Sequence, residues 1–119
     1  MLTKVQIDAF AKDWIDSWNA HDLERILSHY TDDVELTSPI AAQRLNRPNG
    51  RVVGKEDLRA YFTVGLQAFP DLHFDLHDIM SGVSSVVLYY TNQKGARVGE
   101  YMEIAPNGLV SRVVANYSD

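Results

Sequence analysis

Residues 97–117 read RVGEYMEIAPNGLVSRVVANY, and this stretch predicts a β-hairpin. The residues on both sides of Asn107-Gly108 are rich in Val, Tyr and Ile, which favour strands. Asn-Gly is the strongest short signal for a two-residue turn between antiparallel strands. We therefore expect strands at 97–104 and 109–117, paired antiparallel.

The strand pattern extends upstream to Pro70. Residues 72–80 and 83–91 have the same composition, and glycine-containing breaks separate them from each other and from the hairpin. The second half of the chain therefore predicts an antiparallel meander of four strands.

The first half of the chain carries helical periodicity. Residues 3–19 place apolar side chains three and four positions apart, and Thr3 with Gln6 forms a capping-box pair at the start. Asp22 is a suitable cap for a second helix. The apolar stripe of this second helix is predicted to contain Leu23, Ile26, Leu27 and Tyr30.

A short strand at 34–38 follows, and Pro39 ends it. Residues 39–53 contain three arginines, two prolines and no acidic residue, so they predict an irregular loop, and loops of this length often serve a site. A third helix is predicted over 55–69. This order of elements, with helices first and the meander second, predicts an α+β fold. In such a fold a curved, mostly antiparallel sheet wraps around the three helices of the N-terminal half.

Length and composition narrow the classes of function. A chain of 119 residues predicts a single domain over 1–119. Its net charge of −5 argues against nucleic acid as a partner, because phosphate binding needs a basic surface. No apolar run reaches the length of a membrane span, and the start of the chain lacks a signal-peptide core, so we expect no membrane contact and a cytoplasmic location.

Glu100 is the most informative polar residue. The two-residue period places it on one face with Val98, Met102 and Ile104. A carboxyl group on an apolar face either lines a cavity, where burial raises its pKa and suits it to act as an acid or hydrogen-bond donor, or costs several kcal/mol. The alternatives are a bulge that turns Glu100 to solvent and an interface pairing with an arginine.

Three aromatic residues on the helical stripes also carry hydrogen-bonding groups: Trp14, Trp18 and Tyr30. Core packing explains each of them individually, but together with Glu100 they could also furnish donors around an apolar cavity. No set of His, Asp or Glu has the spacing of metal ligands, and the chain has no cysteine, so we expect neither a metal nor a cofactor.

The order of elements and several segments resemble the nuclear-transport-factor-2-like superfamily, in particular its SnoaL-like and ketosteroid isomerase-like members. The resemblance covers the whole chain. The segments that carry it are Trp18-Asn19-Ala20-His21-Asp22, Tyr30-Thr31-Asp32-Asp33-Val34, Gly54-Lys55, Phe69-Pro70-Asp71-Leu72 and Ala115-Asn116-Tyr117-Ser118. It implies a cone-shaped fold around an apolar pocket, and a homodimer.

The resemblance also implies positions for a site. The acid on the oxyanion side of the isomerases falls on Glu100, and the isomerase base falls on Ser38, a departure that removes the usual base. The His-Asp pair of SnoaL-like cyclases corresponds to Thr37 and Ser38, so this pair is missing too. The isomerase tyrosines fall on Trp14, Tyr30 and Phe62, and an aromatic pocket position falls on Tyr117.

These observations favour a protein that binds a small apolar ligand. In one interpretation it is a general acid-base isomerase, cyclase or lyase acting on an apolar carbonyl compound. Glu100, Tyr30 and Trp14 are then the catalytic candidates, and the substrate-binding candidates are Trp18, Ser38, Phe62 and Tyr117. In the alternative, the chain is a non-catalytic ligand carrier or a protein-interaction module of the same fold.

Overall fold

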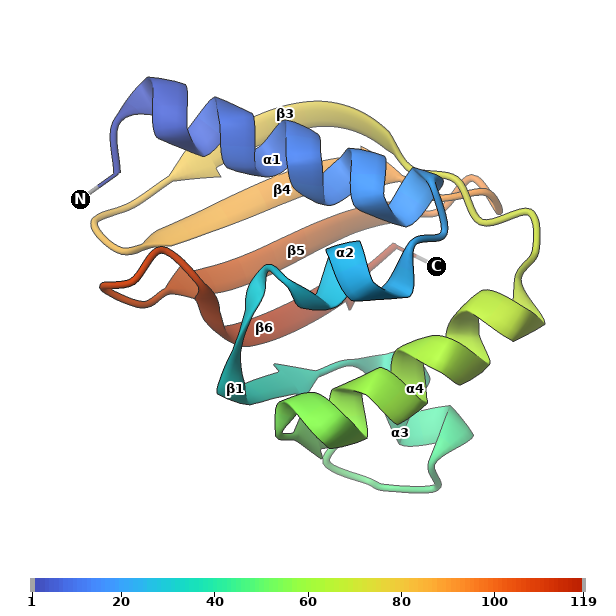
Figure 1. Ribbon diagram of the computed structural model, residues 1–119. Coiled ribbons are helices and arrows are strands. Elements are labelled where there is room, and N and C mark those ends of the chain that lie inside the picture. Colours follow the sequence, from blue (N-terminus) through green and yellow to red (C-terminus); the bar gives the residue numbers. More distant parts are fainter. Residues whose placement is uncertain (1, 119) are drawn as a thin grey trace.

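The computed structural model describes residues 2–118 and alternates helices and strands before a run of four strands (Figure 1). The elements are α1 (Lys4–Asn19), α2 (Leu23–Leu27), β1 (Tyr30–Thr37), α3 (Pro39–Arg44), β2 (Arg51–Val53), α4 (Lys55–Ala68), β3 (Asp75–Ser81), β4 (Ser85–Thr91), β5 (Arg97–Ile104) and β6 (Val110–Tyr117).

The six strands form one curved, open sheet in the order β2-β1-β6-β5-β4-β3. Every neighbouring pair is antiparallel except β1 and β6, which run parallel. The predicted meander is therefore confirmed, and so is the hairpin at Asn107-Gly108. Gly108 has a φ of +85°, which the turn requires and glycine adopts without steric cost.

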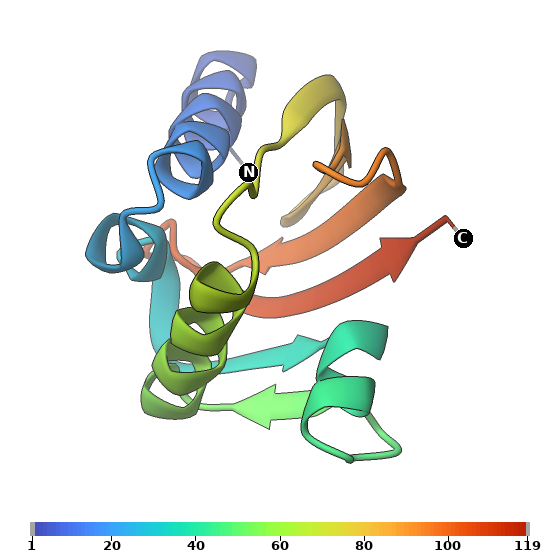
Figure 2. The same cartoon turned by 90° about the vertical axis from the view of Figure 1, so that its right-hand side faces the viewer.

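The helices cover the concave face of this sheet (Figure 2). Helix α1 packs against β3 at one end of the sheet, and α4 packs against β1 and β2 at the other. Both predicted caps are present: Thr3 and Gln6 form a reciprocal capping box on α1, and the Asp22 carboxylate accepts the Arg25 N–H at the start of α2. The predicted α+β architecture is confirmed.

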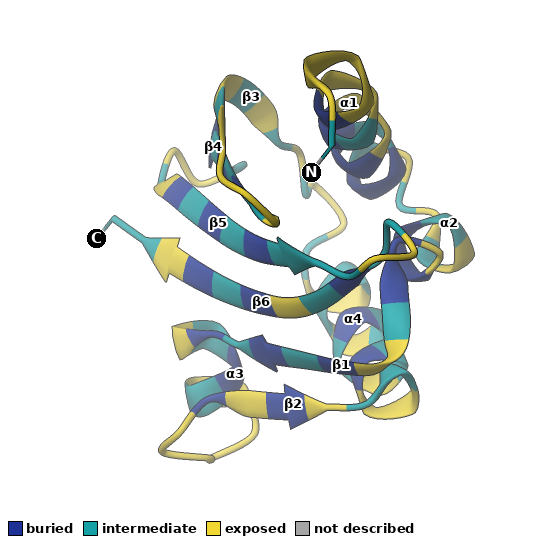
Figure 3. Cartoon of the chain, turned by 90° about the vertical axis from the view of Figure 1, so that its left-hand side faces the viewer, coloured by how far each residue is buried: buried dark blue, intermediate teal, exposed yellow. Residues whose placement is uncertain are grey.

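Burial alternates along the central strands (Figure 3). In β5, Val98, Glu100 and Met102 are buried, whereas Gly99 and Tyr101 on the other face are only partly covered. The register of β5 with β4 is regular from Arg97 to Glu103, so no bulge rotates Glu100 toward solvent. The inner face of the sheet and the helices above it form the core.

The prediction that Tyr30 lies on the second helix is wrong. Helix α2 ends at Leu27, where the Ser28 hydroxyl donates to the Arg25 carbonyl and the His29 ring contacts the Ile26 carbonyl. Tyr30 instead begins β1 and pairs in parallel with Val110. Its spacing fits a helix, but pairing with a strand far away in the sequence decides its conformation.

The prediction of an irregular loop over 39–53 is also wrong. Ser38 caps a short helix, α3, by accepting the Ile40 N–H, and Pro39 occupies its first turn, where a missing N–H costs nothing. Residues 51–53 then form β2, which pairs with β1. None of the helices within residues 2–118 is long and apolar enough to cross a membrane.

Candidate functional site

A cavity of about 130 Å³ lies between the helices and the inner face of the sheet. Its walls come from α1, α3, α4 and four strands, and most of the side chains are aromatic or aliphatic. They are Trp14, Trp18, Leu36, Ser38, Ile40, Arg44, Tyr61, Phe62, Gly65, Phe69, Leu72, Phe74, Tyr90, Asn92, Gln93, Lys94, Glu100, Ala115 and Tyr117.

Glu100 lies in this wall among apolar neighbours. Across the strands it faces Leu88 of β4 and Ala115 of β6. Along its own strand, Val98 and Met102 flank it on the same face. Glu100 is only 6% exposed, and among the described residues it is the only one with a carboxyl group in the cavity wall.

One hydrogen bond holds the carboxyl group. The Tyr90 hydroxyl donates to Glu100 Oε1 at 2.8 Å. Burial raises the pKa of Glu100 to about 7, and the Tyr90 hydrogen bond lowers it in part. Within residues 2–118 no basic side chain forms an ion pair with this carboxyl group, so only the Tyr90 hydrogen bond favours its charged form. The group can therefore both give and take a proton near neutral pH.

Tyr90 is a residue that the sequence analysis missed. It alternates with Tyr89 along β4, and its inward position follows from the burial of Val86 and Leu88. Its bond to Glu100 is diagonal, because Leu88 stands directly opposite Glu100 and Tyr90 stands opposite Val98. Only the strand register could have shown this contact.

Three hydroxyl groups line the cavity on the α3 and α4 side: those of Ser38, Tyr61 and Tyr117. Burial raises the pKa of Tyr61 and of Tyr117, and the nearby Ser38 hydroxyl lowers both in part. Ser38 Oγ accepts the Ile40 N–H, which leaves its own proton free to be donated. Tyr61 was also missed as a site residue, although its place on the inner stripe of α4 was a usable signal.

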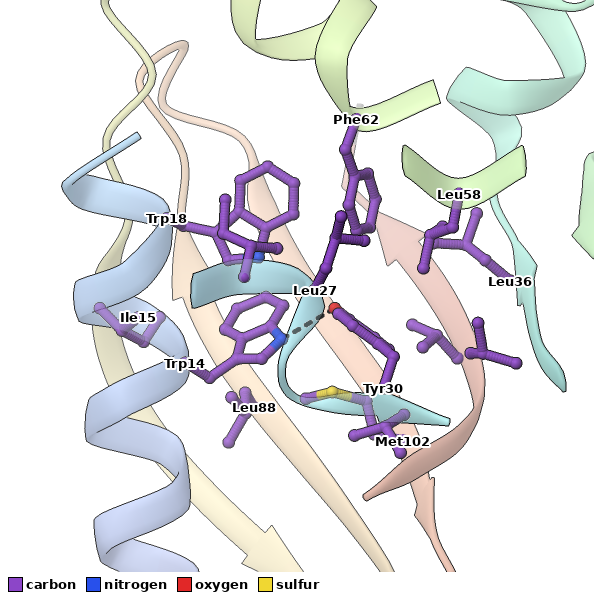
Figure 4. Close-up of a cluster of buried hydrophobic side chains, with 14 of the residues drawn as sticks. Trp14, Ile15, Trp18, Leu27, Tyr30, Leu36, Leu58, Phe62, Leu88 and Met102 are labelled. Atoms are coloured by element: carbon purple, nitrogen blue, oxygen red, sulfur yellow. Dashed lines mark hydrogen bonds between the residues drawn. The ribbon is translucent and has the colours of Figure 1, made fainter. Parts of the chain in front are cut away.

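Trp14 and Tyr30 are bonded to each other (Figure 4). The Trp14 indole N–H donates to the Tyr30 hydroxyl at 3.0 Å, and both residues are almost completely buried. Trp14 contributes its ring to the cavity wall, whereas Tyr30 is not part of that wall. Burial raises the pKa of Tyr30, so its hydroxyl is neutral.

Trp18 and Phe62 complete the aromatic wall. Their rings meet edge to face with centroids 4.7 Å apart. The Trp18 indole nitrogen is buried and has no hydrogen-bond partner within residues 2–118. The structure thus brings together in one wall Glu100, Trp14, Trp18, Ser38, Phe62 and Tyr117, and leaves Tyr30 behind it.

The site offers little to a metal ion. In the part of the chain that the structure describes, no three His, Asp or Glu side chains gather closely enough to hold one. Among the described residues, the polar side-chain groups in the cavity wall are hydroxyls, amides, two indole N–H groups, two cations and one carboxyl group.

Comparison with known families identifies the fold. Residues 11–114 match the family model of the SnoaL-like domain. This chain belongs to the SnoaL-like family. A SnoaL-like protein of unknown function from Burkholderia thailandensis is similar over 98% of both chains, with 40% identity and a TM-score of 0.95. No curated protein matches the sequence significantly.

More distant structures share the fold of this SnoaL-like chain. A candidate ketosteroid isomerase from Kribbella flavida has 20% identity and a TM-score of 0.75, covering 97% of this chain and 79% of its own. The protein TerC, co-crystallised with polyporic acid, has 14% identity and a TM-score of 0.77, covering 95% and 92%. Others are described as NTF2-like proteins and share this fold. The predicted membership of the SnoaL-like family is confirmed by the family model.

Proposed function

We propose that this SnoaL-like protein binds an apolar carbonyl compound and moves a proton on it by general acid-base catalysis. One observation carries the proposal: Glu100 lies buried in an aromatic cavity, where it accepts a hydrogen bond from Tyr90 and burial raises its pKa to about 7. A carboxyl group of this kind is half ionised at neutral pH, where general acid-base catalysis is most efficient.

The proton transfer follows from the arrangement of the cavity wall. The Glu100 carboxylate removes a proton from the carbon next to the carbonyl group, and the C–H electron pair becomes part of an enolate. The enolate oxygen accepts hydrogen bonds from the hydroxyls of Ser38, Tyr61 or Tyr117, which line the same cavity. Protonated Glu100 then returns its proton to the substrate, at the same carbon or at another position.

In this proposal the other candidate site residues support the reaction without exchanging a proton with the substrate. The rings of Trp14, Trp18 and Phe62 form an apolar wall that excludes water from the reacting group. Tyr30 accepts the Trp14 N–H and so fixes the Trp14 ring, which makes Tyr30 a positioning residue.

Exchange of hydrogen for deuterium tests the proton transfer without knowledge of the natural substrate. The probe is 2-acetylnaphthalene in D2O, and NMR follows the loss of its acetyl methyl protons. We expect the protein to accelerate this exchange and Glu100→Gln to lose roughly 100-fold or more of the acceleration, because an amide cannot accept the proton.

Glu103→Gln is the matched control. Glu103 lies on the same strand but on the opposite face, where it pairs with Arg112. This variant should exchange the probe at the parent rate. Exchange by the parent at the uncatalysed rate, or by Glu100→Gln at the parent rate, would refute the catalytic role.

A ligand carrier is the second candidate function, and the residue before Pro39 favours it. The base position implied by the isomerase resemblance holds Ser38, which caps α3. Among residues 2–118, Glu100 is then the only carboxyl group in the cavity wall. Native mass spectrometry of the purified protein distinguishes the two functions. A retained apolar compound, together with no exchange activity, would identify a carrier.

A further inference from the structure

The rim of the cavity carries two cations on one aromatic ring. Arg44 is the last residue of α3, and Lys94 lies in the turn between β4 and β5. The Arg44 guanidinium carbon is 4.9 Å from the centroid of the Phe69 ring, and the Lys94 ammonium nitrogen is 4.6 Å from it. The two charges are therefore at most about 10 Å apart, close to the screening length of physiological salt.

Neither cation has an acidic partner in the part of the chain that the structure describes. Over residues 2–118, Arg44 and Lys94 form no ion pair with a carboxylate, although the chain has sixteen acidic residues and a net charge of −5. Most of the other lysines and arginines do form such pairs. Two unpaired like charges held at one ring repel each other, and an anion between them would relieve this repulsion.

Among the described residues, neither Arg44 nor Lys94 forms an ion pair with Glu100. The pKa of Glu100 responds to burial and to Tyr90, whereas Arg44 lowers in part the pKa of Tyr61, which burial raises. The positive charge of Arg44 thus acts on the α4 side of the cavity.

The rim also holds an amide that is free to bind. Gln93, next to Lys94, lines the cavity, and its side-chain oxygen is buried without a hydrogen-bond partner among the described residues. A side-chain amide can turn to present its NH2 group instead, which would donate to an anion at the rim.

We propose that the ligand has an anionic group at one end, such as a carboxylate, which binds at the rim between Arg44 and Lys94. Its apolar body then fills the cavity, and its carbonyl group lies near Glu100. This inference rests on the proposed function and narrows its substrate class from apolar carbonyl compounds to apolar keto acids and related anions.

A matched pair of probes tests the charge requirement. The acid is 6-acetyl-2-naphthoate, and the neutral probe is 2-acetylnaphthalene, which lacks only the carboxylate. Quenching of the fluorescence of Trp14 and Trp18, both in the cavity wall, reports the Kd of each probe. We expect the acid to bind about tenfold more tightly than the neutral probe at low salt, and this advantage to shrink as salt is added.

The double variant Arg44→Gln/Lys94→Gln should abolish that advantage, because it weakens binding of the acid about tenfold more than binding of the neutral probe. Lys4→Gln/Lys12→Gln is the control, because it removes the same charge from exposed positions on α1 and should retain the advantage. Circular dichroism checks that both variants fold.

Two different failures can be told apart. If the parent binds both probes equally, or if the rim variant weakens both by the same factor, the proposed anion site is refuted while ligand binding stands. If neither probe binds the parent, the proposed ligand-binding function fails, and the inference fails with it.

Discussion

Glu100 holds a carboxyl group between apolar residues on both adjacent strands, and this burial has a thermodynamic cost. The unfolded chain ionises Glu100 near its ordinary pKa of 4.5, whereas the folded chain keeps it protonated up to about pH 7. Between these two pH values the folded state binds the extra proton, so the free energy of unfolding falls as the pH rises. Above about pH 7 this contribution no longer changes.

Glu100→Gln should remove this pH dependence. Relative to the variant, the parent should lose about 3 kcal/mol of unfolding free energy between pH 4.5 and about pH 7, because one pKa unit corresponds to about 1.4 kcal/mol. Urea unfolding of both proteins over this range measures the difference. A difference that stays constant with pH would show that folding does not raise the pKa of Glu100.

At the scale of elements, the segment from α3 to β2 builds one wall of the cavity through a close backbone contact. Gly50 has a φ of +63°, and its carbonyl accepts the Ser38 N–H. A Cβ atom at Gly50 would lie 2.5 Å from the Ser38 carbonyl oxygen, which is backbone and cannot move away easily. The contact fixes the place of Ser38 and the start of α3.

Gly50→Ala should therefore destabilise the protein by about 2 kcal/mol or more, through both the positive φ and the clash. Gly95→Ala is the control, because Gly95 has a φ of +81° but nothing within 4 Å of a Cβ atom. It should cost only about 1 kcal/mol. Thermal or urea unfolding compares the two, and equal losses would show that the contact with Ser38 does not matter.

At the scale of the whole molecule, none of the helices within residues 2–118 covers the outer face of the sheet (Figure 3). Three partly buried apolar residues lie in a row across neighbouring strands on this face: Val87, Tyr101 and Val114. We propose that a second copy of the chain covers this row in a homodimer, as the family resemblance implies.

Light scattering should then give twice the mass of the chain. Val114→Lys should shift the mass toward that of a single chain, because a charge at this position would be buried in the interface. Ser111→Lys, near the start of the same strand, is the matched control and should leave the mass unchanged. A parent protein with the mass of one chain would refute the homodimer.

Local patterns in the sequence were sufficient for most of the fold. The capping box at Thr3, the cap at Asp22 and the turn at Asn107-Gly108 act through neighbouring residues, so each could be identified without knowledge of the rest of the chain. The two-residue period also placed Glu100 on the apolar face of its strand. Propensity, capping and turn chemistry operate over a few residues, which is why the sequence by itself determined these features.

Only the tertiary structure decided which residues far apart in the sequence contact each other. Tyr30 fitted a helical stripe but joined the sheet through Val110, and Pro39 began a helix rather than a loop. The hydrogen bond from Tyr90 to Glu100 depends on strand register. Arg44 and Lys94 both contact the Phe69 ring, and these three residues come from three separate parts of the chain. Contacts between residues far apart in the chain arise only when the elements pack, so no local pattern in the sequence contains them.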